Sequence, residues 1–211
     1  MEFDNFTADY LAVDGITHPP RLDNLRKIKR DLTGCQFAKE YYFNQGILET
    51  ILPLVNLETP DEELLEMLSI VNTYFFFESQ PSALECFKLF EGTSFAFLRE
   101  KIRFPGVPGS IVDMILRVIQ SQLDSGLTSA RHFEDDFLDV IVKSMSIQSR
   151  QRTMIIARIT EKLADEELRF RVRPCCAAII KCLVPVVVSH EAYSEEMLLT
   201  SLRTLNVLCQ D

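Results

Sequence analysis

Residues 35–56 read CQFAKEYYFNQGILETILPLVN and hold two short helix patterns that meet at one glycine. Apolar residues recur at helical spacing on both sides of Gly46, which predicts two amphipathic helices. A helix that ends here needs a residue that tolerates a positive φ, and glycine has no Cβ to oppose it. We therefore predict a hinge at Gly46, from which the second helix leaves at a steep angle. The apolar positions are Ala38, Tyr41, Tyr42 and Phe43 before the hinge and Ile47, Leu48, Ile51, Leu52 and Val55 after it.

A longer helix pattern precedes this pair. Residues 21–34, RLDNLRKIKRDLTG, carry one apolar stripe and close with Gly34. The spacing of that stripe is that of a single helix face. The local unit is therefore one long helix followed by two short helices. The stripe consists of Leu22, Leu25, Ile28 and Leu32.

This unit recurs along the chain. Five long helix patterns are predicted, and successive starts are separated by 42, 47, 43 and 43 residues. The longest step contains the loop FPGVPGS, residues 104–110, which we interpret as a connection between repeats of one solenoid; the alternative is a boundary between two separate domains. A period of about 40 to 47 residues is typical of helical solenoids, whose units bury their apolar faces against their neighbours. The five starts are Leu22, Leu64, Ile111, Met154 and Met197.

Residues 34–56, GCQFAKEYYFNQGILETILPLVN, resemble the helix junction of the armadillo-repeat family, in which a long inner helix is accompanied by two short helices around a glycine. The resemblance extends over residues 21–211. It implies an all-α, right-handed armadillo/HEAT-like helical solenoid of about four to five repeats. Residues 1–20 would then form an acidic N-terminal arm. The segments LDNLRKIKRDLTG and NQGILETILPLVN also resemble the N-terminal repeats of the armadillo subunit of the GID/CTLH ubiquitin ligase.

These resemblances imply a non-enzymatic protein–protein interaction scaffold, a subunit or fragment of a ubiquitin-ligase-type assembly with several protein partners. One alternative is a nuclear-transport-type peptide-binding adaptor. Adaptors of that kind carry rows of Trp and Asn on their inner helices, whereas this chain has no Trp. Asn72 and Asn206 lie near the places where such asparagines would stand. A second alternative is an enzyme with a site between helices, which would require an enclosed polar cavity rather than an open groove.

The composition of the chain limits the classes of partner that we expect. The 211 residues include 31 acidic and 22 basic side chains, for a net charge of −9, which disfavours nucleic acid as a partner. The first residues, MEFDNFTADYLAVDG, are acidic where a secretory or mitochondrial leader would be basic. No stretch holds the roughly 18 uninterrupted apolar residues of a membrane span. We expect a protein of the cytoplasm, the nucleus or both, without membrane contact.

No residue pattern predicts catalysis, a cofactor or a metal. The three histidines, His18, His132 and His190, are scattered and lack a second ligand at helical spacing. The six cysteines show no C-x-x-C pair, and we expect them to be reduced and mostly buried. Cys175 and Cys182 would lie roughly 10 Å apart on one helix, which is too far for a disulfide.

Bases are concentrated on the first long helix, against an acidic background. Because these bases lie outside the apolar stripe, they would face the groove of the solenoid or the solvent, where they could bind an acidic peptide. The alternative is an ordinary solvated helix face. We therefore name as candidate partner-binding residues Arg26, Lys27, Lys29, Arg30, Asn72, Arg203 and Asn206.

The last helix pattern, EEMLLTSLRTLNVLCQD, is apolar on more than one side. Solenoid ends usually have a polar outer face, so this end is expected to dock on a partner, to pair with a second copy, or to mark a cut in a longer protein. At the other end, apolar residues of the arm could fold over the first repeat. Upstream of the last helix, Pro185 is expected to end or kink the helix that contains it.

Overall fold

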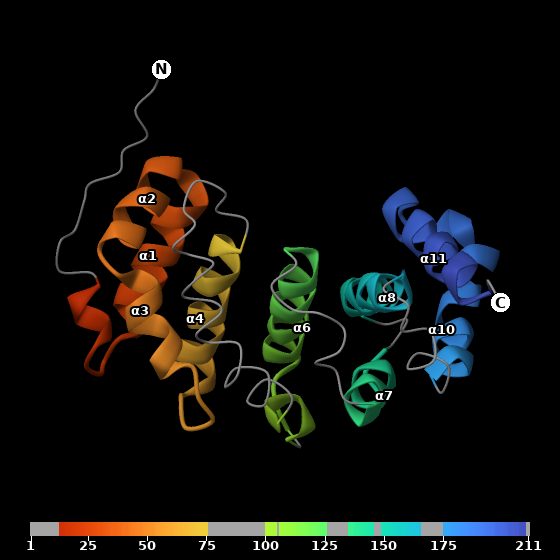
Figure 1. Ribbon diagram of the computed structural model, residues 1–211, viewed down its shortest axis with the longest axis horizontal. Coiled ribbons are helices and arrows are strands. Elements are labelled where there is room, and N and C mark those ends of the chain that lie inside the picture. The colour runs from red at the N-terminus through yellow and green to blue at the C-terminus, as the bar shows by residue number, and fades with distance from the viewer. Residues whose placement is uncertain are drawn as a thin grey trace. The chain divides into compact units, whose positions relative to one another are not determined.

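The structure is a computed structural model that describes residues 13–75, 100–104, 106–125, 135–145, 149–165 and 175–209. The chain divides into two compact units, residues 1–118 and 119–211, each with its own packing. The elements assigned in the described ranges are all helices (Figure 1). None of these helices is long and apolar enough to cross a membrane.

The first unit is built on two long helices that lie side by side. Helix α1 (Leu22–Gly34) packs along α4 (Asp61–Tyr74), with α2 (Gln36–Asn44) and α3 (Ile47–Ile51) connecting them (Figure 1). Short 3₁₀ turns cover Asp14–Ile16 and Leu52–Leu54. The long α6 (Gly109–Asp124) starts in this unit and ends in the second.

The core of the first unit is formed by the predicted apolar stripes. Side chains of α1, α2, α3 and α4 are shielded from solvent together, including Leu25, Ile28, Tyr42, Ile47, Leu48, Ile51, Leu64 and Met67. Two tyrosines keep their hydroxyl groups satisfied at the edge of this core. Tyr42 donates to Asp31 Oδ2 at 2.6 Å, and Tyr74 donates to the Lys39 carbonyl at 3.1 Å. Burial raises the pKa of Tyr74 well above its usual range, so this hydroxyl remains a donor.

The hinge predicted at Gly46 is confirmed. Gly46 has φ 74° and ψ 34°, the left-handed conformation, and separates α2 from α3. Its N–H donates to the Phe43 carbonyl at 3.0 Å. The Thr50 hydroxyl then returns to the Gly46 carbonyl at 2.8 Å. The hinge thus uses both backbone groups of the glycine to close one helix and open the next.

The segment before α1 packs against it. Val13 and Ile16 are buried, and Asn24 Nδ2 of α1 donates to the Gly15 carbonyl at 3.2 Å. This end of the first unit therefore has an apolar cover. The apolar residues of the arm before position 13 lie outside the described residues.

The second unit contains α7 (Asp135–Lys143), α8 (Arg150–Asp165), α10 (Cys176–Val188) and α11 (Glu195–Leu208), with a 3₁₀ turn at His190–Ala192. Helix α11 packs most closely on α8 and next on α10. Its first turn is capped by the Ser194 hydroxyl, which accepts from the Met197 N–H. The hydroxyl of Thr204, which is fully buried, is a donor shared by two carbonyls: Thr200 of α11 at 2.9 Å and Ala157 of α8 at 3.2 Å, and the second contact links the two helices.

All five long helices predicted from the sequence are present, as α1, α4, α6, α8 and α11. Helix α10 runs through Pro185 to Val188, so the helix does not end at the proline. The expectation that the cysteines are mostly buried is wrong. Only Cys175 among the described cysteines is buried, while Cys209 is exposed. None of the described cysteines is in a disulfide. The sequence also predicts a second short-helix segment, SALECFKLFEG (residues 82–92), which ends at Gly92. This segment and His132 lie outside the described residues.

Candidate protein-binding groove

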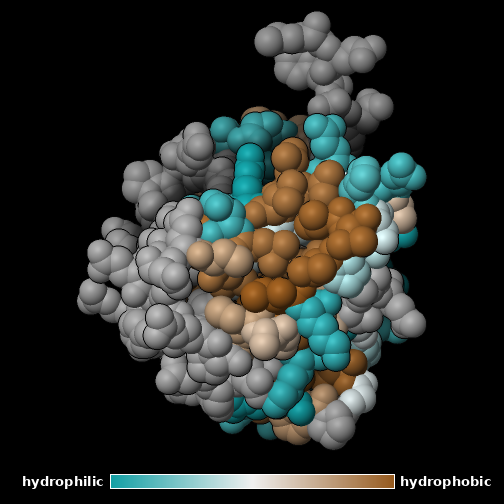
Figure 2. All heavy atoms as spheres, turned by 90° about the vertical axis from the view of Figure 1, so that its right-hand side faces the viewer, coloured by the Kyte–Doolittle hydropathy of each residue, from teal (hydrophilic) through white to brown (hydrophobic). Residues whose placement is uncertain are grey.

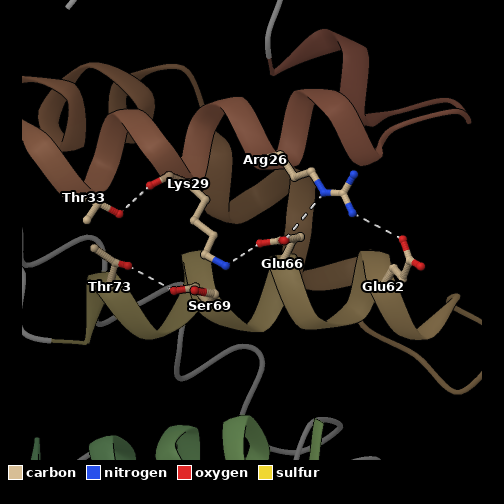
Figure 3. Close-up of polar contacts among 7 residues, drawn as sticks. All are labelled: Arg26, Lys29, Thr33, Glu62, Glu66, Ser69 and Thr73. Carbon is tan, nitrogen blue, oxygen red and sulfur yellow. Dashed lines mark hydrogen bonds and ion pairs between the residues drawn. The ribbon is translucent and has the colours of Figure 1, made fainter. Parts of the chain in front are cut away.

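Ion pairs join the two long helices of the first unit (Figure 3). Arg26 and Lys29 extend from α1 toward α4, where Glu62 and Glu66 receive them. The shortest contact joins Lys29 Nζ to Glu66 Oε2 at 2.7 Å, and Arg26 reaches Glu62 at 3.4 Å and Glu66 at 3.9 Å. Nearby, Arg21 Nε lies 3.2 Å from Glu63 Oε2. These bases therefore already have acidic partners within the chain.

These ion pairs involve two of the candidate partner-binding residues of the first unit. Arg26 and Lys29 are engaged with α4, Lys27 is half-buried and has an interaction of its own, and Arg30 is exposed. Asn72, near the end of α4, is half-buried and also has an interaction of its own. A role for these residues in binding an outside partner stays a prediction.

The second unit repeats the same arrangement. Arg158 of α8 contacts Glu196 of α11, just as Arg26 of α1 contacts Glu62 of α4. Both acids are the second residue of their helix, where the N-terminal end of the helix dipole favours a negative charge. Each pair thus connects a base in the body of one long helix to the acidic first turn of the next.

A groove with a volume of about 480 Å³ lies in the second unit around the Arg158–Glu196 pair. Three long helices supply its walls: the end of α6, one face of α8 and one face of α11. It is open to solvent. The lining residues are Gln120 and Asp124 from α6; Arg158, Glu161 and Lys162 from α8; and Glu196, Leu199, Thr200, Arg203 and Val207 from α11.

The charges in this groove balance, although the whole chain carries −9. Two of the three acids have visible partners: Glu196 pairs with Arg158, and Asp124 accepts from Gln120 Nε2 at 3.3 Å. The bases Lys162 and Arg203 border the same space, beside the apolar Leu199 and Val207. Such a lining can bind a polar segment of another protein. The charged and polar side chains contact the carboxylates and backbone amides of that segment, and the apolar residues contact the aliphatic parts of its side chains.

The sequence indicated only part of this site. Arg203 lines the groove, and Asn206 is exposed on the same helix without being among the lining residues. The α1 and α4 candidates belong to the other unit. Sequence reasoning missed Lys162, Glu161 and Gln120. Their signal was their spacing of three or four residues from Arg158 or Asp124 on the polar sides of amphipathic helices, but every solvated helix face has that spacing.

Comparison with known proteins identifies the fold. No protein-family model and no curated protein matches the chain. Among solved structures, the chain is similar to an engineered protein from the Northeast Structural Genomics Consortium, with a TM-score of 0.62 and 14% identity over 94% of this chain and 78% of that one. It is also similar to the designed armadillo repeat protein YIII(Dq)4CqI, with a TM-score of 0.55 and 12% identity over 94% of this chain and 99% of that one. The fold is therefore an all-α, armadillo-like helical-repeat fold.

Proposed function

We propose that the protein is a non-enzymatic scaffold that holds a segment of a partner protein in the groove between α8 and α11. The observation that carries the proposal is the groove itself, whose lining comes from successive long helices and combines balanced charges with two apolar side chains. Helical-repeat proteins typically use surfaces of this kind, assembled from neighbouring repeats, to bind extended ligands.

The groove favours a segment with at least one acidic side chain. Arg158 is already paired with Glu196, so Lys162 and Arg203 are the bases best placed for a carboxylate of the partner. Gln120 and Thr200 offer polar groups for the partner's backbone. Leu199, 45% exposed, gives an apolar contact at the rim.

We place this scaffold in a multi-subunit assembly of the ubiquitin-ligase type, in the cytoplasm or the nucleus. Support for this finer proposal comes from residues 22–34 and 44–56, which resemble the N-terminal repeats of the armadillo subunit of the GID/CTLH ligase. Self-association through the last helix is part of the same proposal, and the exposure of Leu199 and Leu202 supports it.

Affinity purification followed by mass spectrometry tests the proposal, with Lys162→Glu as the groove variant. The matched control is Lys181→Glu, the same charge reversal at an exposed position of α10 outside the groove. We expect a set of proteins that co-purify with the wild type and the control and are depleted with Lys162→Glu, because the reversal repels the partner's carboxylate. Identical sets from all three proteins would contradict groove binding. A depleted set without any ubiquitin-ligase subunit would contradict the finer assignment only.

A further inference from the structure

The outer face of the last two helices is apolar. Figure 2 shows a broad hydrophobic patch where α10 and α11 face the viewer. The large apolar side chains that are exposed on these two helices are Val184 at 41%, Val188 at 73%, Leu199 at 45% and Leu202 at 44%. The other end of the chain differs, because Val13 and Ile16 cover α1 there. Contiguous apolar patches of this kind on soluble proteins usually mark a contact surface.

The charges beside this patch have a specific order on α11. Glu195 stands four residues before Leu199 and Arg203 stands four residues after it, and both charged side chains are exposed. At 1.5 Å of rise per residue, each charge lies about 6 Å along the helix from Leu199, in opposite directions. Residues four apart lie on one side of a helix, so the three side chains share a flank.

We propose that this face binds a second copy of the chain, with the two α11 helices antiparallel about a two-fold axis at Leu199. Such a symmetric contact uses the same surface on both partners. It places Glu195 of each copy opposite Arg203 of the other, which forms two equivalent ion pairs around a Leu199–Leu199 contact. Leu202 of α11 and Val184 and Val188 of α10 enlarge the apolar area on either side.

Charge complementarity favours a second copy as the occupant. The chain carries −9 overall, so most of its surface repels another copy, but the Glu195–Leu199–Arg203 flank is neutral and self-complementary. The complementarity holds only for the antiparallel arrangement, since a parallel one would place like charges opposite each other. This inference deepens the self-association proposed above. Leu199 and Arg203 also line the groove, whereas Glu195 and Leu202 do not. Glu195→Arg and Leu202→Asp therefore test the dimer apart from the groove ligand, and Lys162→Glu tests the groove ligand apart from the dimer.

Sedimentation equilibrium of the full chain over a range of concentrations tests the dimer. We expect the wild type to be a dimer at the higher concentrations. Arg203→Glu and Glu195→Arg, each alone, are expected to weaken the dimer by about tenfold or more in Kd, because each places like charges at both contacts. The double variant, with both charges exchanged, is expected to recover the wild-type Kd.

Two further variants separate a lost contact from a lost fold. Leu202→Asp places a charge in the apolar part of the same face and is expected to give a monomer. Glu40→Arg, a charge reversal at an exposed acid of α2, is expected to leave the dimer unchanged. Circular dichroism confirms that each variant keeps its helix content. A wild type that is monomeric at every concentration would overturn the proposal. So would single charge variants that dimerise like the wild type, or a double variant that stays as weak as the single ones.

Discussion

Gly46 decides the local geometry of the first repeat at the scale of one residue. A Cβ added at this position would meet only Glu49 Oε2, at 3.6 Å, which is an ordinary van der Waals distance. The space around the hinge therefore accepts a side chain. What excludes other residues is the backbone, since φ is 74° and a β-branched residue is strained there.

We expect Gly46→Val to lower the free energy of unfolding by about 1 kcal/mol or more, measured by urea denaturation. Gly46→Asn is the control, because asparagine adopts the left-handed conformation more readily and is expected to cost less. The account of the hinge would fail if both variants unfolded at the same urea concentration as the wild type.

The contact between long helices is the feature that matters at the scale of elements. Helix α11 is joined to α8 by an exposed ion pair, Arg158–Glu196, and by the buried hydroxyl of Thr204, which reaches the Ala157 carbonyl. Exposed ion pairs contribute little to stability, whereas a buried hydrogen bond loses its full value when one partner is removed. The threonine is therefore the better probe of this contact.

Thr204→Val is expected to destabilise the protein by about 1 kcal/mol, because it removes a buried hydroxyl that bonds to the Thr200 carbonyl within α11 and to the Ala157 carbonyl of α8. Thr160→Val is the matched control: Thr160 is also buried, but its hydroxyl bonds only within α8, to the Ile156 carbonyl at 2.8 Å. Thermal unfolding of both variants gives the comparison. Equal losses of stability in the two variants would show that the bond from Thr204 to the Ala157 carbonyl adds nothing beyond a hydroxyl bond within one helix.

The helices and their contacts show how much of the fold could be predicted from the sequence. Helices and the Gly46 hinge were predictable because apolar spacing and glycine are local signals, and the long helices appear where their patterns begin. The pairing of Lys29 with Glu66 was not predictable, because the two residues are 37 positions apart and meet only through the packing of α1 on α4. For the same reason, α1 was predicted as a basic surface for outside partners, whereas two of its bases contact acids of α4: Arg26 contacts Glu62 in its first turn, and Lys29 contacts Glu66 further along.

At the scale of the whole molecule, the repeat period indicated the fold class, and the comparisons with solved repeat proteins confirm it. The groove could not be predicted in the same way. Its residues come from α6, α8 and α11, and only Arg203 had been named. The exposed last helix was predictable in part: Leu199 and Leu202 face solvent, but Met197 is buried against the rest of the unit.

Cross-linking mass spectrometry of the protein with its co-purified partner, using a lysine-reactive reagent, tests the scaffold function most directly. Lys162 lines the groove, whereas Lys143 and Lys181 are exposed outside it and act as internal controls. The account predicts that Lys162 cross-links to one contiguous, acidic segment of the partner and that the Lys162→Glu protein does not recover that partner. Cross-links to the partner from Lys143 or Lys181, with none from Lys162, would contradict binding in the groove.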